Sequence, residues 1–324
     1  MTTSFLRPLA LASLGLLLAA CSAAPSPMPS SSTAPSDRPT TSPSRSPIPP
    51  LGASPSPVAS PSESPTGSPA ANDLPADPNT LVLAMRQEGG FIAPSASFAG
   101  PAGISVYADG RVITPGAQTM IYPGALLAPL TLGHLSLDQV RAGLAAAAAA
   151  GLSGGGDQSY PARGVADMPN TVFVVWSPAG PTTTSFGALE SGVAAPDPTE
   201  AQARTAALAF STILSALTTL LNTETYQPSA VRLLVSPAAP TDPSLPAGRP
   251  LAWPLAAPLG SFGTPYPAGS AGARCGAVSG PELATLWPLL KGANQLTTWT
   301  SGGKLYQLVV RQLLPDESGG CPSA

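Results

Sequence analysis

Two serines stand in patterns that mark the nucleophiles of hydrolases. Ser153 occupies the centre of Gly151–Gly155, which satisfies G-x-S-x-G, and Ser301 precedes Lys304 in a segment that satisfies S-x-x-K. The first pattern needs its serine between a strand and a helix, and the second needs serine and lysine one helical turn apart. Here the first pattern ends an expected helix, and the second holds two glycines in an expected hairpin turn. The residues therefore predict a helix stop and a turn, with a serine hydrolase at Ser153 as an alternative.

His134 is the single histidine of the chain, so a Ser-His-acid or Cys-His site would have to use it. It lies two residues before the predicted helix cap Ser136, which favours a loop or helix-start residue. With Cys275 and Cys321 expected to be bridged to each other, one histidine leaves no zinc ligand set, and the carboxylates lack the dense spacing of a calcium loop. We expect no catalytic residue, no metal and no cofactor. A hydrolase whose carboxylates meet only in the fold stays open as an alternative.

The cysteines divide by position. Cys21 follows residues 9–20, twelve uncharged residues behind Arg7. That run is too short to cross a bilayer and is typical of a cleaved signal peptide. Cys275 and Cys321 are then an even remainder, which predicts a disulfide in an oxidising compartment.

Leu18-Ala19-Ala20-Cys21 resembles the lipobox of bacterial lipoproteins. In that family a peptidase cleaves before the cysteine, and the cysteine thiol carries a diacylglycerol. The resemblance implies lipidation at Cys21 and a location on the outer face of the bacterial plasma membrane. Two or more acyl chains make such an anchor effectively stable.

The chain has a net charge of −3, and charged residues make up 10% of it. No basic face stands out, which argues against nucleic acid and anionic lipid as partners. We therefore expect the membrane to be contacted through the lipid anchor alone. Residues 22–79 hold sixteen prolines and fifteen serines without an aromatic residue, a composition typical of a disordered tether.

The remainder predicts an α+β fold, with antiparallel sheets each packed by a helix. Strands are expected at 81–86 and 231–235, and hairpins at 104–113, 171–186 and 298–311. Helices are expected after the caps Ser136, Asp197 and Ser279. The inward positions expected in the first two helices are Leu137, Val140, Leu144, Ala148, Ala203, Ala207, Phe210, Ile213, Leu214, Leu217 and Leu221.

Pro288 is expected to kink or shorten the third helix. Residues 236–272 are rich in proline and glycine and are expected to be irregular. The division is a signal peptide at 1–20, a lipidated cysteine and linker at 21–79, and two α+β halves at 80–226 and 227–324. Because the order of elements in the halves is similar, they are possible related subdomains.

Four segments of the folded part resemble landmarks of uncharacterised actinobacterial-type lipoproteins. They are Gly89-Gly90-Phe91, Asp109-Gly110-Arg111-Val112, Tyr122-Pro123-Gly124 and Leu313-Leu314-Pro315-Asp316-Glu317. The element order across 85–221, with Gly89, Gly90 and Phe91, is also similar to emfourin-type proteins. That resemblance implies inhibition of thermolysin-like metallopeptidases.

Trp253 stands in the irregular 236–272 stretch and is the tryptophan expected to be exposed for binding, whereas the other three are expected in the core. Together with Gly89–Phe91 it makes the candidate binding set. The leading hypothesis is a non-enzymatic, lipid-anchored module that binds a protein, a peptide or an envelope ligand. The alternatives are a surface-tethered protease inhibitor and a hydrolase.

Overall fold

The computed structural model describes residues 74–100, 103–239, 244, 250–267 and 270–322. These residues belong to one unit that begins at Pro65. The expected signal peptide, Cys21 and the linker up to residue 73 lie outside them. Over the part of the chain that is described, no helix has the length and apolar character needed to cross a membrane.

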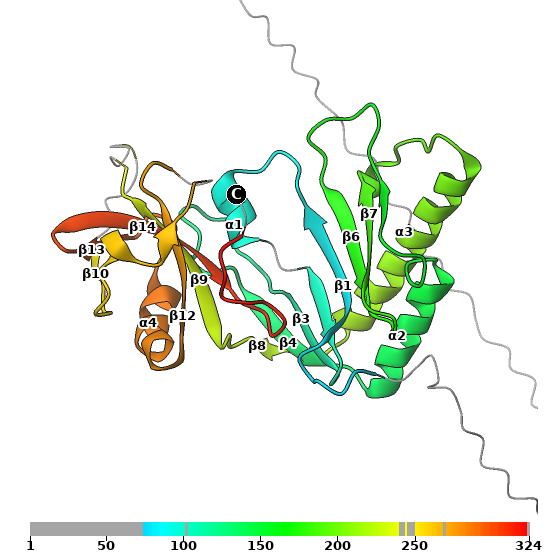
Figure 1. The fold of residues 1–324 in the computed structure, drawn as a ribbon, viewed down its shortest axis with the longest axis horizontal. Helices are drawn as coiled ribbons and strands as arrows, with labels where there is room; N and C mark the ends of the chain where they lie inside the picture. The colour runs from blue at the N-terminus through cyan, green and yellow to red at the C-terminus, as the bar shows by residue number, and fades with distance from the viewer. Residues whose placement is uncertain (1–73, 101–102, 240–243, 245–249, 268–269, 323–324) are drawn as a thin grey trace, which may run out of the picture. The chain divides into compact units, whose positions relative to one another are not determined.

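The first sheet takes all its strands from the chain between Leu81 and Thr225 (Figure 1). Its spatial order is β5-β7-β6-β1-β2-β3-β4-β8. The strands are β1 (Leu81–Glu88), β2 (Ile104–Tyr107), β3 (Arg111–Pro115), β4 (Leu130–His134), β5 (Gln158–Tyr160), β6 (Asn170–Val175), β7 (Thr182–Gly187) and β8 (Glu224–Thr225).

The second sheet takes its strands from the chain between Ala230 and Gln312, in the order β10-β13-β14-β9-β12-β11. These strands are β9 (Ala230–Pro237), β10 (Leu251–Ala252), β11 (Thr264–Pro265), β12 (Arg274–Ser279), β13 (Thr298–Ser301) and β14 (Lys304–Gln312). The helices are α1 (Pro94–Ala99), α2 (Leu137–Ala149), α3 (Pro198–Thr219) and α4 (Gly280–Gly292), with single turns η1 (Leu189–Ser191) and η2 (Leu259–Ser261).

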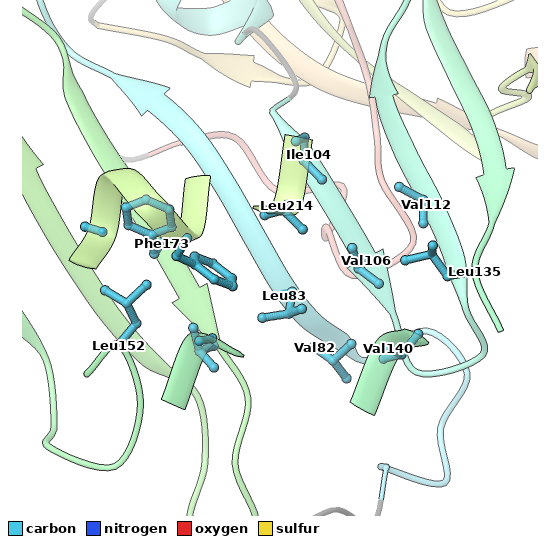
Figure 2. Packing of buried hydrophobic residues seen from close by; sticks show 14 of the residues in the cluster. Val82, Leu83, Ile104, Val106, Val112, Leu135, Val140, Leu152, Phe173 and Leu214 are labelled. Atoms are coloured by element: carbon cyan, nitrogen blue, oxygen red, sulfur yellow. The ribbon is translucent and has the colours of Figure 1, made fainter. Parts of the chain in front are cut away.

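Helices α2 and α3 lie side by side on one face of the first sheet (Figure 1). Figure 2 shows Leu83 of β1, Phe173 of β6 and Leu214 of α3 gathered in the core between these layers. Helix α4 packs on β12 and β9 of the second sheet, and a separate apolar core lies there. Removing this apolar surface from water is the main stabilising contribution to each layer pair.

The α+β class is confirmed, with two corrections. Both sheets are mixed and not purely antiparallel, because β5 runs parallel to β7 and β10 runs parallel to β13. These parallel pairs sit at the sheet edges, where a short segment can join without a hairpin. The first sheet is covered by two helices and not by one.

The expected inward face of α2 is partly wrong. Leu137 is 44% exposed, whereas Val140, Gly143 and Ala147 face the core. A Cβ atom placed on Gly143 would lie 3.0 Å from Leu83 Cδ1, so the helix comes close to β1 along its small residues. In α3, Ile213 is also exposed, contrary to expectation.

Pairing with other strands gives regular structure to segments that the local sequence predicted to be loops. His134 ends β4, where it pairs with Arg111 of β3, so it is not a loop residue. The stretch 236–272 contains β10, η2 and β11. Pro288 lies inside α4, which continues to Gly292, so the proline does not shorten the helix.

The two halves join their last hairpins to their first strands differently. In the first half β6, which opens its hairpin, lies beside β1. In the second half β14, which closes its hairpin, lies beside β9. The similar order of elements therefore does not extend to a similar strand order, and the relation of the halves as subdomains stays a prediction.

Candidate functional site

Two arginines face the same side of the second sheet. Successive side chains of a strand point to opposite faces of its sheet. In β9, alternate side chains enter the core beneath α4: those of Val231, Leu233 and Val235. Arg232 and Leu234 therefore point to the opposite face. In the register of β9 and β14, Arg232 lies directly opposite Arg311. The topology therefore brings two guanidinium groups together on the face that α4 does not cover.

This face is covered by α1 and by the C-terminal tail. Phe98 of α1 is buried there with Leu234, and its ring meets Tyr266 edge to face at 5.9 Å. Figure 1 shows the tail in red, running from β14 toward α1. Because the Gly89-Gly90-Phe91 segment lies just before α1 in the chain, it leads to the face that carries the two arginines.

Arg311 is fully engaged by its surroundings. Its Nη2 lies 2.6 Å from Glu317 Oε1, and its Nη1 donates to the carbonyl oxygens of Ala99 and Gly100 at 3.1 and 3.0 Å. The second oxygen of Glu317 accepts the backbone N–H of Leu314 at 2.9 Å. This arginine therefore ties β14, α1 and the tail to one another.

Arg232 has far fewer partners. It is only 9% exposed, and its Nη2 donates to the carbonyl oxygen of Ser318 at 2.8 Å. Its Nε is buried and finds no hydrogen-bond acceptor among the described residues. Burial lowers the pKa of Arg232, the Glu317 carboxylate opposes this shift, and the neighbouring Arg311 adds to it.

A pocket of about 430 Å³ opens beside these arginines. We call it the arginine pocket; its charged wall consists of Arg86, Glu88, Arg232, Arg311 and Glu317. Phe98, Ile92 and Gly89 also line it. The volume lies within the range of small-ligand sites in proteins.

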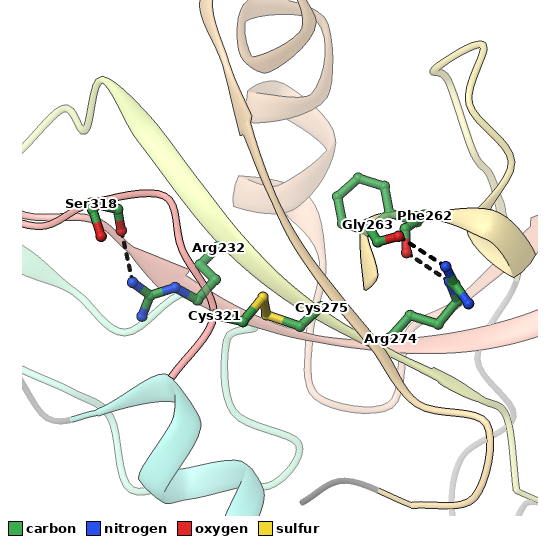
Figure 3. Close-up of a disulfide and its surroundings, with 7 residues drawn as sticks. All are labelled: Arg232, Phe262, Gly263, Arg274, Cys275, Ser318 and Cys321. Carbon is green, nitrogen blue, oxygen red and sulfur yellow. Dashed lines mark hydrogen bonds between the residues drawn. A yellow bond between two sulfur atoms is a disulfide. The ribbon is translucent and has the colours of Figure 1, made fainter. Parts of the chain in front are cut away.

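The disulfide predicted between Cys275 and Cys321 is present. Figure 3 shows it beside Arg232, whose guanidinium reaches Ser318 in the same tail. The bridge joins β12 to the last described residues, so it holds the tail that forms one wall of the arginine pocket.

The Gly89-Gly90-Phe91 segment follows β1 directly, and its first residue, Gly89, lines the arginine pocket. Gly89 and Gly90 adopt φ angles of 71° and 82°, in the region that favours glycine. A Cβ atom on Gly90 would lie 3.2 Å from the backbone nitrogen of Pro169. The Phe91 N–H donates to the carbonyl oxygen of Asp167 at 3.2 Å, so this loop is joined to the loop before β6.

These two joined loops carry large exposed apolar side chains, which we call the apolar loop surface. Phe91 is 88% exposed. The members of the surface are Phe91, Ile92, Val165 and Met168. Ile92 also lines the arginine pocket, so the apolar loop surface and the charged pocket are continuous.

Trp253 is not a free surface aromatic. Its ring is half-buried and meets Trp299 and Phe262 edge to face, at 6.0 and 6.2 Å between ring centroids. Its Nε1 donates to the carbonyl oxygen of Ala257 at 2.8 Å. It packs with the core beneath α4, so the structure does not bring it together with Gly89–Phe91.

The nucleophile patterns lie in turns, as expected. Ser153 follows the end of α2 and precedes the short β5, so no strand leads into it. Ser301 and Lys304 face each other across the β13–β14 turn, and Ser301 Oγ accepts the backbone N–H of Leu259. No group of three histidine, cysteine or acidic side chains that could hold a metal ion occurs among the residues described.

Comparison with known proteins identified no relative of this chain. No family model, no curated protein and no solved structure matches this chain. The resemblances seen in the sequence therefore stay predictions, and the function has to be argued from the site itself.

Sequence reasoning missed Arg232, Arg311 and their pocket. The available signal was a charged residue inside an apolar strand, as in Val231-Arg232-Leu233-Leu234-Val235. Arginine is rarely buried without a partner, so such a position indicates an ion pair or a binding site. The partners lie far along the chain, and only the pairing of β9 with β14 brings them together.

Proposed function

We propose that this chain is a non-enzymatic, lipid-anchored extracytoplasmic lipoprotein that binds a peptide or protein partner through the apolar loop surface. The observation that carries the proposal is Phe91, a large aromatic side chain held 88% exposed by two glycines and a backbone hydrogen bond. Exposed apolar surface of this kind, next to polar groups, is typical of interaction sites.

The anchor is supported by Leu18-Ala19-Ala20-Cys21 and by the Cys275–Cys321 bridge, since disulfides persist mainly outside the reducing cytosol. Metabolic labelling with palmitate tests it. We expect label on the wild-type protein and none on Cys21→Ser. Equal labelling of both would overturn the anchor.

Binding through the apolar loop surface is tested by capture of envelope proteins on the immobilised protein. Phe91→Ala should lose the captured partner, because aromatic side chains supply much of the binding energy of interfaces. Leu220→Ala is the matched control, since Leu220 at the end of α3 is also 88% exposed. Equal capture by both variants would contradict the proposal.

A surface-tethered protease inhibitor is the second candidate. The same Phe91 favours it, because inhibitor loops gain affinity by being held in place before they bind. The purified protein should slow thermolysin at micromolar concentration, and Phe91→Ala should relieve the inhibition. Unchanged peptidase activity at that concentration would end this candidate.

A further inference from the structure

We propose that the arginine pocket binds a carboxylate group and that Arg232 supplies its counter-charge. This inference rests on the proposed function, because the carboxylate would belong to the peptide or protein that covers the apolar loop surface.

The described charges of the pocket wall do not cancel. Arg86 and Glu88 form an ion pair at 2.6 Å, and so do Arg311 and Glu317. Arg232 forms no ion pair with any residue that the structure describes. Among the described residues the wall therefore carries one excess positive charge, which one carboxylate would neutralise.

The unpaired charge of Arg232 is buried. A buried guanidinium is costly unless it is paired and hydrogen-bonded. Arg232 is 9% exposed, and among the described residues its guanidinium has one hydrogen bond, to the neutral carbonyl of Ser318. Arg232 also lines the pocket, so a ligand can approach the unpaired group from that side.

Arg311 places a second positive charge directly opposite Arg232. Like charges directly opposite each other on neighbouring strands are destabilising, and Arg232 and Arg311 are such a pair. Glu317 accepts hydrogen bonds from Arg311 and neutralises its charge. An anion bound at Arg232 would neutralise the second guanidinium and so remove the remaining repulsion between the two arginines. Arginine binds carboxylates through two parallel hydrogen bonds, which adds geometric selectivity.

The rim of the pocket indicates what carries the carboxylate. Ile92 and Phe98 contribute apolar surface to the same pocket, and Phe91 stands just outside it. A carboxylate attached to an apolar residue would place its charge at Arg232 and its side chain against Ile92. A peptide offers this combination either at its C-terminus or at an acidic side chain that follows an apolar residue.

The test uses heteronuclear NMR of the arginine Nε–H groups in the full-length wild-type protein. N-acetyl-leucine presents a C-terminal carboxylate, the α-amide of N-acetylaspartate presents a side-chain carboxylate, and N-acetyl-leucinamide presents none. We expect a saturable shift of the Arg232 signal with one of the two carboxylates, which identifies its source, and no shift with the amide. Shifts with neither carboxylate, or only with inorganic phosphate, would overturn the proposal.

Variants add a second measurement. Arg232→Gln should weaken binding of the carboxylate probe by about tenfold or more. Arg274→Gln is the control, because Arg274 also donates to backbone carbonyls, those of Phe262 and Gly263, but does not line the pocket (Figure 3). If Arg232→Gln does not fold, the wild-type titration decides alone.

The two proposals can fail separately. Capture of a partner that depends on Phe91 but not on Arg232 would leave the proposed function standing and reject the carboxylate site. A carboxylate that binds at Arg232, together with capture that ignores Phe91, would reject the apolar loop surface and keep the pocket as a small-molecule site.

Discussion

Gly110 shows how a single residue type is required by close backbone packing. It lies in the turn between β2 and β3 with a φ of 88°, and its carbonyl accepts the backbone N–H of Leu135 at 2.9 Å. A Cβ atom there would lie 2.3 Å from the carbonyl oxygen of Leu135. Both the φ angle and the contact exclude a side chain at this position.

We therefore expect Gly110→Ala to lower the free energy of unfolding by about 2 kcal/mol or more. Gly292→Ala is the control, since a Cβ atom on Gly292 meets open space at the end of α4. The control should leave the free energy of unfolding unchanged or raise it by up to about 1 kcal/mol. Urea unfolding measures both variants, and equal stability of the two would contradict this account.

The disulfide acts at the scale of elements, because it attaches the tail to β12. Cys275 and Cys321 are separated by 46 residues, and Glu317 and Ser318 lie in the loop that the bridge closes. Replacing both cysteines by serine should lower the free energy of unfolding by about 2–5 kcal/mol. Hydrogen exchange should rise in the tail, because the tail is then no longer attached to β12 and the Ser318 carbonyl is no longer held at Arg232. Unchanged exchange in the tail would contradict this role.

Elements defined by local interactions were predictable from the sequence. The Ser136–Gln139 capping box forms both of its hydrogen bonds, and Asp197 caps α3 through the Glu200 N–H, because each cap involves residues three apart. In contrast, β12 contains glycine and polar residues, and it is ordered by its pairing with β9. The arginine pocket depends on long-range pairing of the same kind, between β9 and β14, so the sequence did not predict it; of its lining, only Gly89 belongs to the candidate binding set.

At the scale of the whole described unit, the tail connects the two sheets. Tyr107 of β2 donates to Asp316 at 2.7 Å, and Tyr226 donates to the carbonyl oxygen of Leu313 at 2.9 Å. Burial raises the pKa of Tyr226 to about 12, with Asp316 and Glu317 adding to the shift and Arg111 opposing it. Burial and the bond to Asp316 raise the pKa of Tyr107 as well.

These tyrosines predict a loss of stability in alkali. Because folding raises the pKa of Tyr226, its contribution to stability is fully present below the unfolded value of about 10 and falls as the pH rises through about 12. The raised pKa of Tyr107 acts in the same direction. Urea unfolding from about pH 8 upward should show a decline that begins near about pH 10. Tyr226→Phe should make this decline shallower, and a decline of the same steepness in that variant would contradict the argument.

The central claim is that a partner covers the apolar loop surface. Photochemical cross-linking in intact cells tests it most directly, with benzoylphenylalanine in place of Phe91 and, in a separate protein, in place of Leu220, which is equally exposed. The account predicts a discrete cross-linked product from position 91 and none of that mass from position 220. The absence of a product at position 91, or the same product from both positions, would contradict it.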